Sequence, residues 1–277
     1  MTIDLGDSPK RIVALVGPNG CGKSSVFDAM LFKVSTYGGA IGAFGNHRDY
    51  KYHSLLQEPN YQPSGKIDIV FGEDTFDEIV VRHSHTRENR SLFSFRSSFR
   101  YNSNLQIREA KAISDILMNN DGASTASDLD QRIEQDYRRL FGKYNTYLEE
   151  NDCKPSEARA HIIGELNAAL KNCLDLEIDN LGNIEKNQGT LFFKKPDSDR
   201  TFEYNVLSAG EKEVIDILLD LYLRKDSYVD SIYIIDEPEL HLNTSIQRSL
   251  LIEINKMVPS NCQIWIATHS IGFLRAL

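Results

Sequence analysis

The sequence has 277 residues, of which 41% are hydrophobic and 26% charged, and its formal net charge is −9. These values are ordinary for a soluble globular protein, and an acidic chain is a poor general binder of nucleic acid. No run approaches the ~18 apolar residues of a membrane span, so no membrane partner is expected. The four cysteines form no CxxC pair, which argues against a structural zinc site or a disulfide framework and for the reducing cytoplasm.

Residues 11–25 carry the strongest local signal. The apolar, β-branched run from Ile12 to Val16 predicts a buried parallel strand, and a helix with apolar positions at helical spacing follows from Lys23. Residues 17–24 fit the phosphate-loop pattern G-x-x-x-x-G-K-[ST]. The alternative interpretation is a glycine-rich turn that matches this pattern by chance. In such a loop, backbone N–H groups converge on phosphate oxygens at a helix N-terminus.

We expect this loop to bind a nucleotide. Lys23 would reach the β- and γ-phosphates, and the Ser24 hydroxyl would ligate Mg²⁺. The expected nucleotide-binding residues of the loop are Gly17, Pro18, Asn19, Gly20, Cys21, Gly22, Lys23, Ser24 and Ser25.

Beyond the first helix, the patterns predict strands, then helices, then strands again. Alternating apolar residues predict half-exposed antiparallel strands at residues 67–71 and 79–81, and residues 91–100 continue that sheet. Between residues 105 and 173, apolar positions step by three or four, which predicts helices. Strand patterns return at residues 174–178, 190–195 and 201–206.

A basic segment interrupts this acidic chain. Residues 82–108 contain six arginines and one acid, Glu88, for a net charge of +5. Together with the aromatic rings of residues 93–101, they suit a patch that follows phosphates and stacks on bases, with Arg82, Arg96 and Arg100 as candidate DNA contacts. The favoured alternative is a solvated hairpin whose phenylalanines face the core.

Three further motifs follow in the last third of the chain. Residues 207–211, Leu-Ser-Ala-Gly-Glu, open a helix; a buried strand at residues 232–235 ends in Asp236 and Glu237; and a strand ends at His269. Alone, the first motif is a helix cap, and a strand-end histidine is more often structural than catalytic. Acids at a strand end are stronger evidence for a binding site, because ligands bind at the carboxyl ends of parallel strands.

Together and in this order, the motifs resemble those of ATP-binding-cassette (ABC) type ATPases. LSAGE stands in the place of the LSGGQ-like signature, IYIIDE in that of Walker B, and His269 in that of the switch histidine. The resemblance covers residues 12–25 and 207–270. It implies an α/β class P-loop NTPase with the ABC-type ATPase fold, which has a mixed central sheet, an antiparallel β lobe and a helical insert.

The resemblance also implies a role for each residue at the strand ends. Asp236 would hold Mg²⁺ through water. Glu237 would orient or deprotonate the attacking water, and His269 would contact the γ-phosphate of ATP. With Lys23, Glu237 and His269 complete the expected catalytic set.

The signature residues Ser208, Gly210 and Glu211 would bind ATP in trans. They would clamp the γ-phosphate of ATP held by a second chain, so that ATP is sandwiched in a homodimer. Ala209 and Glu211 replace the commonest Gly and Gln, which resembles the non-transporter branches.

The spacing of the motifs indicates the branch. Lys23 and Ser208 are 185 residues apart, more than in typical transporter cassettes, and the run DEPELHL resembles stand-alone ATPases of the OLD, RecF and SMC groups. Several of these resemble ATPases of bacterial anti-phage systems. The resemblance implies an ATP-gated switch that controls an effector such as a nuclease, in trans or in a missing C-terminal region. The alternatives are a RecF/SMC-like DNA-repair ATPase and, less favoured, a transporter ATPase subunit.

We expect one ATPase domain over residues 1–277, truncated at both ends. Residues 1–100 would form the phosphate-loop core and antiparallel β lobe, residues 101–206 the helical insert and return strands, and residues 207–277 the core with the signature, Walker B and switch histidine.

Overall fold

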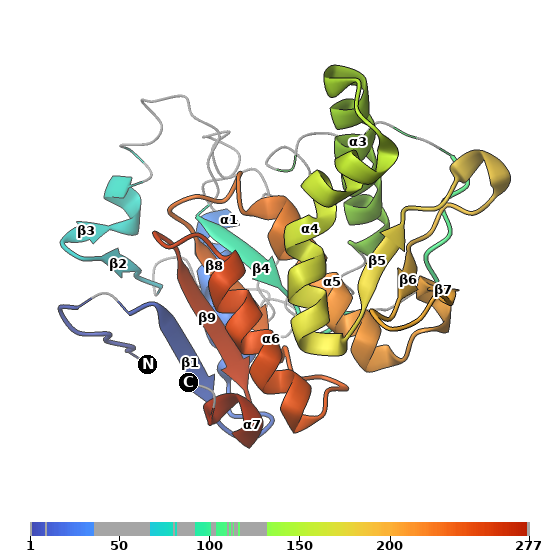
Figure 1. Ribbon diagram of the computed structural model, residues 1–277. Helices are drawn as coiled ribbons and strands as arrows, with labels where there is room; N and C mark the ends of the chain where they lie inside the picture. The colour runs from blue at the N-terminus through green and yellow to red at the C-terminus, as the bar shows by residue number, and fades with distance from the viewer. Residues whose placement is uncertain are drawn as a thin grey trace.

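A four-stranded parallel sheet lies at the centre of the computed structural model, in the order β1–β9–β8–β4 (Figure 1). The strands are β1 (Ile12–Val16), β9 (Gln263–Thr268), β8 (Ile232–Asp236) and β4 (Phe93–Arg96). Their register brings all four carboxyl ends to one edge of the sheet. The structure describes residues 2–8, 10–35, 67–79, 81, 92–100, 104–109, 111, 113, 116 and 132–275.

Helices cover both faces of this sheet. α1 (Lys23–Ser35) packs on one face, whereas α5 (Ala209–Arg224) and α6 (Thr244–Met257) pack on the other. In β8, Ile234 belongs to the apolar cluster on the α1 side, and Tyr233 and Ile235 belong to the cluster on the opposite side. A strand buried on both faces has no position for a solvated side chain, which is why its first four residues carry no charge.

A helical hairpin packs beside α5, and a small antiparallel sheet packs against the hairpin (Figure 1). The hairpin consists of α3 (Ile133–Asn151) and α4 (Pro155–Leu174), which starts with a proline and ends at Asp175 in the left-handed conformation. The sheet consists of β5 (Glu177–Asn180), β6 (Phe192–Lys194) and β7 (Thr201–Glu203). The other short elements are β2 (Val70–Phe71), β3 (Asp74–Thr75), the 3₁₀ helices η4 (Ile184–Lys186) and η5 (Tyr204–Val206), and α7 (Ile271–Leu274).

The predicted α/β class is confirmed. Of residues 105–173, which are predicted to be helical, helices occupy residues 133–151 and 155–173, whereas residues 105–109 are not helical and most of residues 110–131 lie outside the described residues. The return strands lie close to their expected positions, except that residues 204–206 form the 3₁₀ helix η5. The predicted strand at residues 79–81 is wrong, because residues 76–79 form a helical turn after the two-residue strands β2 and β3. Thr75 and Glu78 form a capping box: the Glu78 N–H donates to the Thr75 hydroxyl at 3.3 Å, and the Thr75 N–H donates to the Glu78 carboxylate at 2.8 Å.

The predicted place of residues 91–100 is also wrong. β4 does not extend an antiparallel hairpin but pairs in parallel with β8, so the described strands of the central sheet are all parallel rather than mixed. Phe93 and Phe95 lie in the apolar cluster on the α1 side, and Arg96 on the opposite face is buried against acids of α5. Among the described helices, none is both long and apolar enough to cross a membrane.

Candidate active site

The carboxyl edge of the parallel sheet brings together segments that are far apart in the sequence. β1 leads into the phosphate loop, β9 into His269, β8 into Glu237, and β4 into residues 97–100. The Gly17 N–H donates to the Thr268 carbonyl at 3.4 Å, which ties the start of the phosphate loop to the end of β9. This edge is where parallel sheets bind their ligands.

The phosphate loop is closed by its own lysine. Lys23 Nζ donates to the carbonyls of Gly17 and Pro18 at 3.0 and 3.2 Å. Gly20 and Gly22 have φ values of +81° and +94°, a region that favours glycine, and these turns bring the chain back to the N-terminus of α1. The loop therefore has the lysine and the helix N-terminus that a phosphate group requires.

Ser24 and Asp236 meet across the site. Ser24 Oγ donates to Asp236 Oδ2 at 2.7 Å, and the Asp236 residue is 0% exposed. Burial raises the pKa of Asp236, although the hydrogen bond from Ser24 opposes this. Among the described residues, no group bonds to the other carboxylate oxygen, Oδ1.

A hydroxyl and a carboxylate oxygen side by side fit Mg²⁺. This cation prefers hard oxygen ligands, and it is usually held by one or two carboxylates together with water and substrate phosphates. Among the described residues, Oδ1 of Asp236 has no partner, so it offers an oxygen at this place. Within the described residues, no group of three or more His, Cys, Asp or Glu side chains is arranged to hold a metal ion.

Two glutamates and a histidine lie at the ends of β8 and β9. His269 Nδ1 lies 3.5 Å from Glu237 Oε1 and 3.4 Å from Glu239 Oε1. Glu239 also accepts bonds from the Thr268 hydroxyl at 2.6 Å and the His269 N–H at 2.9 Å. Glu239 thus fixes the backbone of His269, a contact that the sequence analysis missed. Its signal was a second acid two residues after Glu237, at the same strand end.

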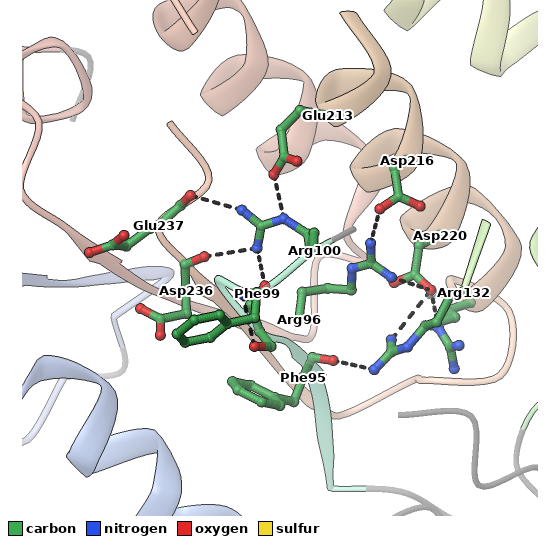
Figure 2. Close-up of polar contacts among 12 residues, drawn as sticks. Phe95, Arg96, Phe99, Arg100, Arg132, Glu213, Asp216, Asp220, Asp236 and Glu237 are labelled. Atoms are coloured by element: carbon green, nitrogen blue, oxygen red, sulfur yellow. Dashed lines mark hydrogen bonds and ion pairs between the residues drawn. The ribbon is translucent and has the colours of Figure 1, made fainter. Parts of the chain in front are cut away.

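Arg96 and Arg100 lie inside the protein, and this corrects their proposed place on a DNA surface. Both side chains are at most 1% exposed and pair with Asp216 and Glu213 of α5 (Figure 2). The third candidate, Arg82, lies outside the described residues. A guanidinium buried in an ion pair is not available to phosphates, so the two described candidates give no support to DNA binding.

The signature residues cap α5 and make their described contacts away from the phosphate loop. The Glu211 N–H donates to Ser208 Oγ at 3.3 Å, and the Ser208 N–H donates to Glu211 Oε2 at 2.8 Å. Gly210 lies against the segment after Walker B, since a Cβ placed on it would be 2.7 Å from the His241 carbonyl oxygen. Ser208 and Ala209 are exposed. The start of α5 is therefore held in place and open to solvent.

The sequence matches the family described as "AAA domain, putative AbiEii toxin, Type IV TA system" over residues 72–275, about three quarters of the chain. The chain belongs to this AAA domain family. The match includes the signature, Walker B and His269, and the expectation of a stand-alone P-loop ATPase of ABC type is confirmed. No curated protein matches this chain in sequence.

Solved structures also resemble the AAA domain. One is the crystal structure of "the SmcHead bound to the C-winged helix domain of ScpA", with 13% identity, a TM-score of 0.45, and coverage of 95% of this chain and 83% of that chain. Another is the SMC head domain from Thermotoga maritima, with 17% identity, a TM-score of 0.42, and coverage of 96% and 83%. At such scores neither likeness bears on activity or partners.

Proposed function

We propose that this AAA domain binds ATP with Mg²⁺ at the carboxyl edge of the sheet and hydrolyses it. The observation that carries the proposal is the 2.7 Å hydrogen bond from Ser24 to Asp236, which joins the phosphate loop to the Walker B strand. Lys23 and the N-terminus of α1 would hold the phosphates. Ser24 and Asp236 would hold Mg²⁺, which neutralises charge on the β- and γ-phosphates when bound.

Glu237 is the proposed general base. Its side chain is 21% exposed, so water can reach it, and it lies beside His269 at the edge of the sheet. Glu237 would accept a proton from the water that attacks the γ-phosphorus, and ADP would leave with the electrons of the broken P–O bond. His269, held by Glu239 through its backbone N–H, would orient the γ-phosphate.

The signature is proposed to act on a second chain. The described side-chain contacts of Ser208 and Glu211 are to each other, and the exposed N-terminus of α5 has the helix dipole that favours an anion. ATP bound to one protomer would therefore be clamped by Ser208, Gly210 and Glu211 of another. The active form would be a homodimer that closes around ATP.

This ATP-dependent dimer is proposed to act in the cytoplasm as a switch on an effector such as a nuclease, in bacterial anti-phage defence. The chain belongs to a family whose description names a type IV toxin–antitoxin system, and this supports a stand-alone regulatory ATPase over a transporter subunit. The effector would be a separate protein or a further region of the same polypeptide.

Phosphate release from Mg²⁺·ATP tests the hydrolytic step. We expect turnover by the wild-type protein and a fall of at least about 100-fold in kcat for Glu237→Gln, with ATP affinity retained. A wild-type protein that binds ATP without turnover would contradict the hydrolytic step.

Control of an effector is tested separately, by co-expressing the protein with the product of the adjoining reading frame. Loss of that partner's activity in Lys23→Ala is expected, and unchanged activity would contradict control by ATP.

A further inference from the structure

Arg100 follows β4 and is buried, with 0% of its side chain exposed. Its Nε pairs with the Glu213 carboxylate of α5. Its Nη1 donates to the Asp236 carbonyl and its Nη2 to the Glu237 carbonyl, both at 2.8 Å. Nη1 also donates to the Ser97 carbonyl. One guanidinium therefore joins α5 to two consecutive carbonyls of the Walker B turn, as Figure 2 shows.

The backbone that Arg100 holds is strained. Glu237 has φ of +47°, a region that residues with a Cβ enter only at a cost. Its N–H donates to the Ala267 carbonyl at 2.9 Å, and its carbonyl also accepts from the Leu240 N–H at 3.3 Å. Strained residues persist where their surroundings over-determine them and cluster at functional sites. This turn sets the directions of the Asp236 and Glu237 carboxylates.

The partner of Arg100 belongs to the helix that the signature opens. Glu213, Asp216 and Asp220 follow at helical spacing on the face of α5 that meets the arginines of β4 and its neighbours. Glu213 is five residues after Ser208, the N-cap of the same helix. Because a helix moves as a rigid element over so short a distance, a displacement at Ser208 also moves Glu213.

We propose that Arg100 is a positioning residue that holds the strained Asp236–Glu237 turn and links it, through Glu213, to the signature helix. The proposal rests on the function proposed above, in which Glu237 activates water. Arg100 itself acts through Glu237 and does not contact the reacting atoms. When a second chain's nucleotide contacts Ser208, a displacement of α5 would be transmitted through Glu213 and Arg100 to the Glu237 carboxylate.

The test compares Arg100→Lys with Arg96→Lys in the whole chain. Lysine keeps the charge but has no planar fork, so it cannot bond Glu213 and both carbonyls together. Arg96 is an equally buried control that pairs with Asp216 and Asp220 of the same helix. For Arg100→Lys we expect kcat to fall at least about tenfold while ATP affinity changes less than about threefold. For Arg96→Lys we expect wild-type kcat.

Hydrogen exchange provides a readout that does not depend on turnover. In Arg100→Lys, the backbone amides of Glu237, Glu239 and Leu240 should exchange faster than in the wild-type protein and in Arg96→Lys. If Arg100→Lys does not fold, Glu213→Gln replaces it in the test. This variant keeps the shape of the partner of Arg100 without its charge, and it should lower kcat and speed exchange in the same way.

The outcomes separate the two proposals. Wild-type kcat and wild-type exchange in a folded Arg100→Lys protein would overturn the positioning role, and so would equal changes in Arg96→Lys. If the wild-type protein shows no turnover, the hydrolytic function fails. Exchange at the amides of Glu237, Glu239 and Leu240 then still decides whether Arg100 holds the turn.

Discussion

Ser24 and Asp236 are 212 positions apart in the sequence and share a hydrogen bond of 2.7 Å. The bond joins the first turn of α1 to the last residue of β8, and it exists although β9 lies between β1 and β8 in the sheet. The two proposed magnesium ligands are therefore already adjacent within one chain. Only the signature would need to come from another.

Lys23→Ala should abolish ATP binding and leave the fold intact. Among the described residues, the ammonium bonds only to carbonyls of its own loop, at 3.0 and 3.2 Å, so the packing of α1 does not depend on it. Charge-assisted bonds to phosphate contribute about 1.5–3 kcal/mol each, so we expect ATP affinity to fall at least about 100-fold. Calorimetric titration measures the affinity, and thermal unfolding checks the fold. Unchanged affinity in the folded variant would contradict the role of Lys23.

Ser24→Ala should raise the concentration of Mg²⁺ that nucleotide binding requires. The substitution removes the hydroxyl beside Asp236, and about tenfold more Mg²⁺ should be needed for half-maximal ATP binding. Titrations of Mg²⁺ at fixed ATP measure the effect. In EDTA the variant and the wild-type protein should bind ATP equally, which serves as the control. A variant with an unaltered Mg²⁺ requirement would argue against this metal site.

Local patterns predicted those parts of the fold whose partners are near in the sequence. The phosphate loop lies between a strand and a helix within 15 residues, and α3 and α4 show their apolar stripes at helical spacing. The helical turn at residues 76–79 could also have been predicted, because Thr75 and Glu78 have capping-box spacing.

The environment of β4 could not be predicted in this way. Its alternation of Phe93 and Phe95 with Ser94 and Arg96 is typical of a half-exposed strand. The acid that covers Arg96 is Asp216, 120 residues further along the chain, and local periodicity contains no information about it. The role of Arg100 is hidden for the same reason, since its acidic partner is 113 residues away and its other described partners are main-chain carbonyls.

Asp220→Asn should destabilise the protein strongly. Asp220 lies 2.5 Å from Arg224, 3.4 Å from Arg132 and 3.9 Å from Arg96, and its side chain is 0% exposed. Burial alone would raise the pKa of Asp220, but these three arginines hold it well below its usual range. The asparagine leaves buried guanidinium groups without their shared anion, so we expect a loss of about 3–5 kcal/mol in the free energy of unfolding at pH 7.

The pH dependence of this loss has a definite sign. An aspartate with a lowered folded-state pKa stabilises the protein above its unfolded value of about 3.9, and the contribution is lost as the pH falls through the folded value. Urea unfolding should therefore give a constant difference between the two proteins from about pH 8 to 5, which shrinks below about pH 4. Asp226→Asn, from an exposed pair with Lys143, is the control and should cost less than about 1 kcal/mol. A loss no larger than the control's would be inconsistent with the buried cluster.

Glu237→Gln should accumulate as a dimer in Mg²⁺ and ATP. The amide keeps the shape of the carboxylate but is a far poorer proton acceptor, so the chemical step slows while the contacts to ATP remain. The dimer would persist because, in the proposed composite site, Lys23 of one chain and the Ser208 turn of the other hold the same nucleotide. Light scattering with and without ATP measures the mass. A variant that stays monomeric at saturating ATP would rule out the composite site.

Ser208→Arg introduced into the same chain should dissolve this dimer, because it places bulk and positive charge in the proposed clamp. The substitution also removes the hydroxyl that accepts from the Glu211 N–H, a cap worth about 1 kcal/mol. Thermal unfolding of the monomer therefore has to show that α5 stays folded, and ATP affinity should match that of Glu237→Gln alone. A double variant that still dimerises with ATP would place the interface elsewhere. A folded monomer that still binds ATP would assign the start of α5 to the partner's nucleotide.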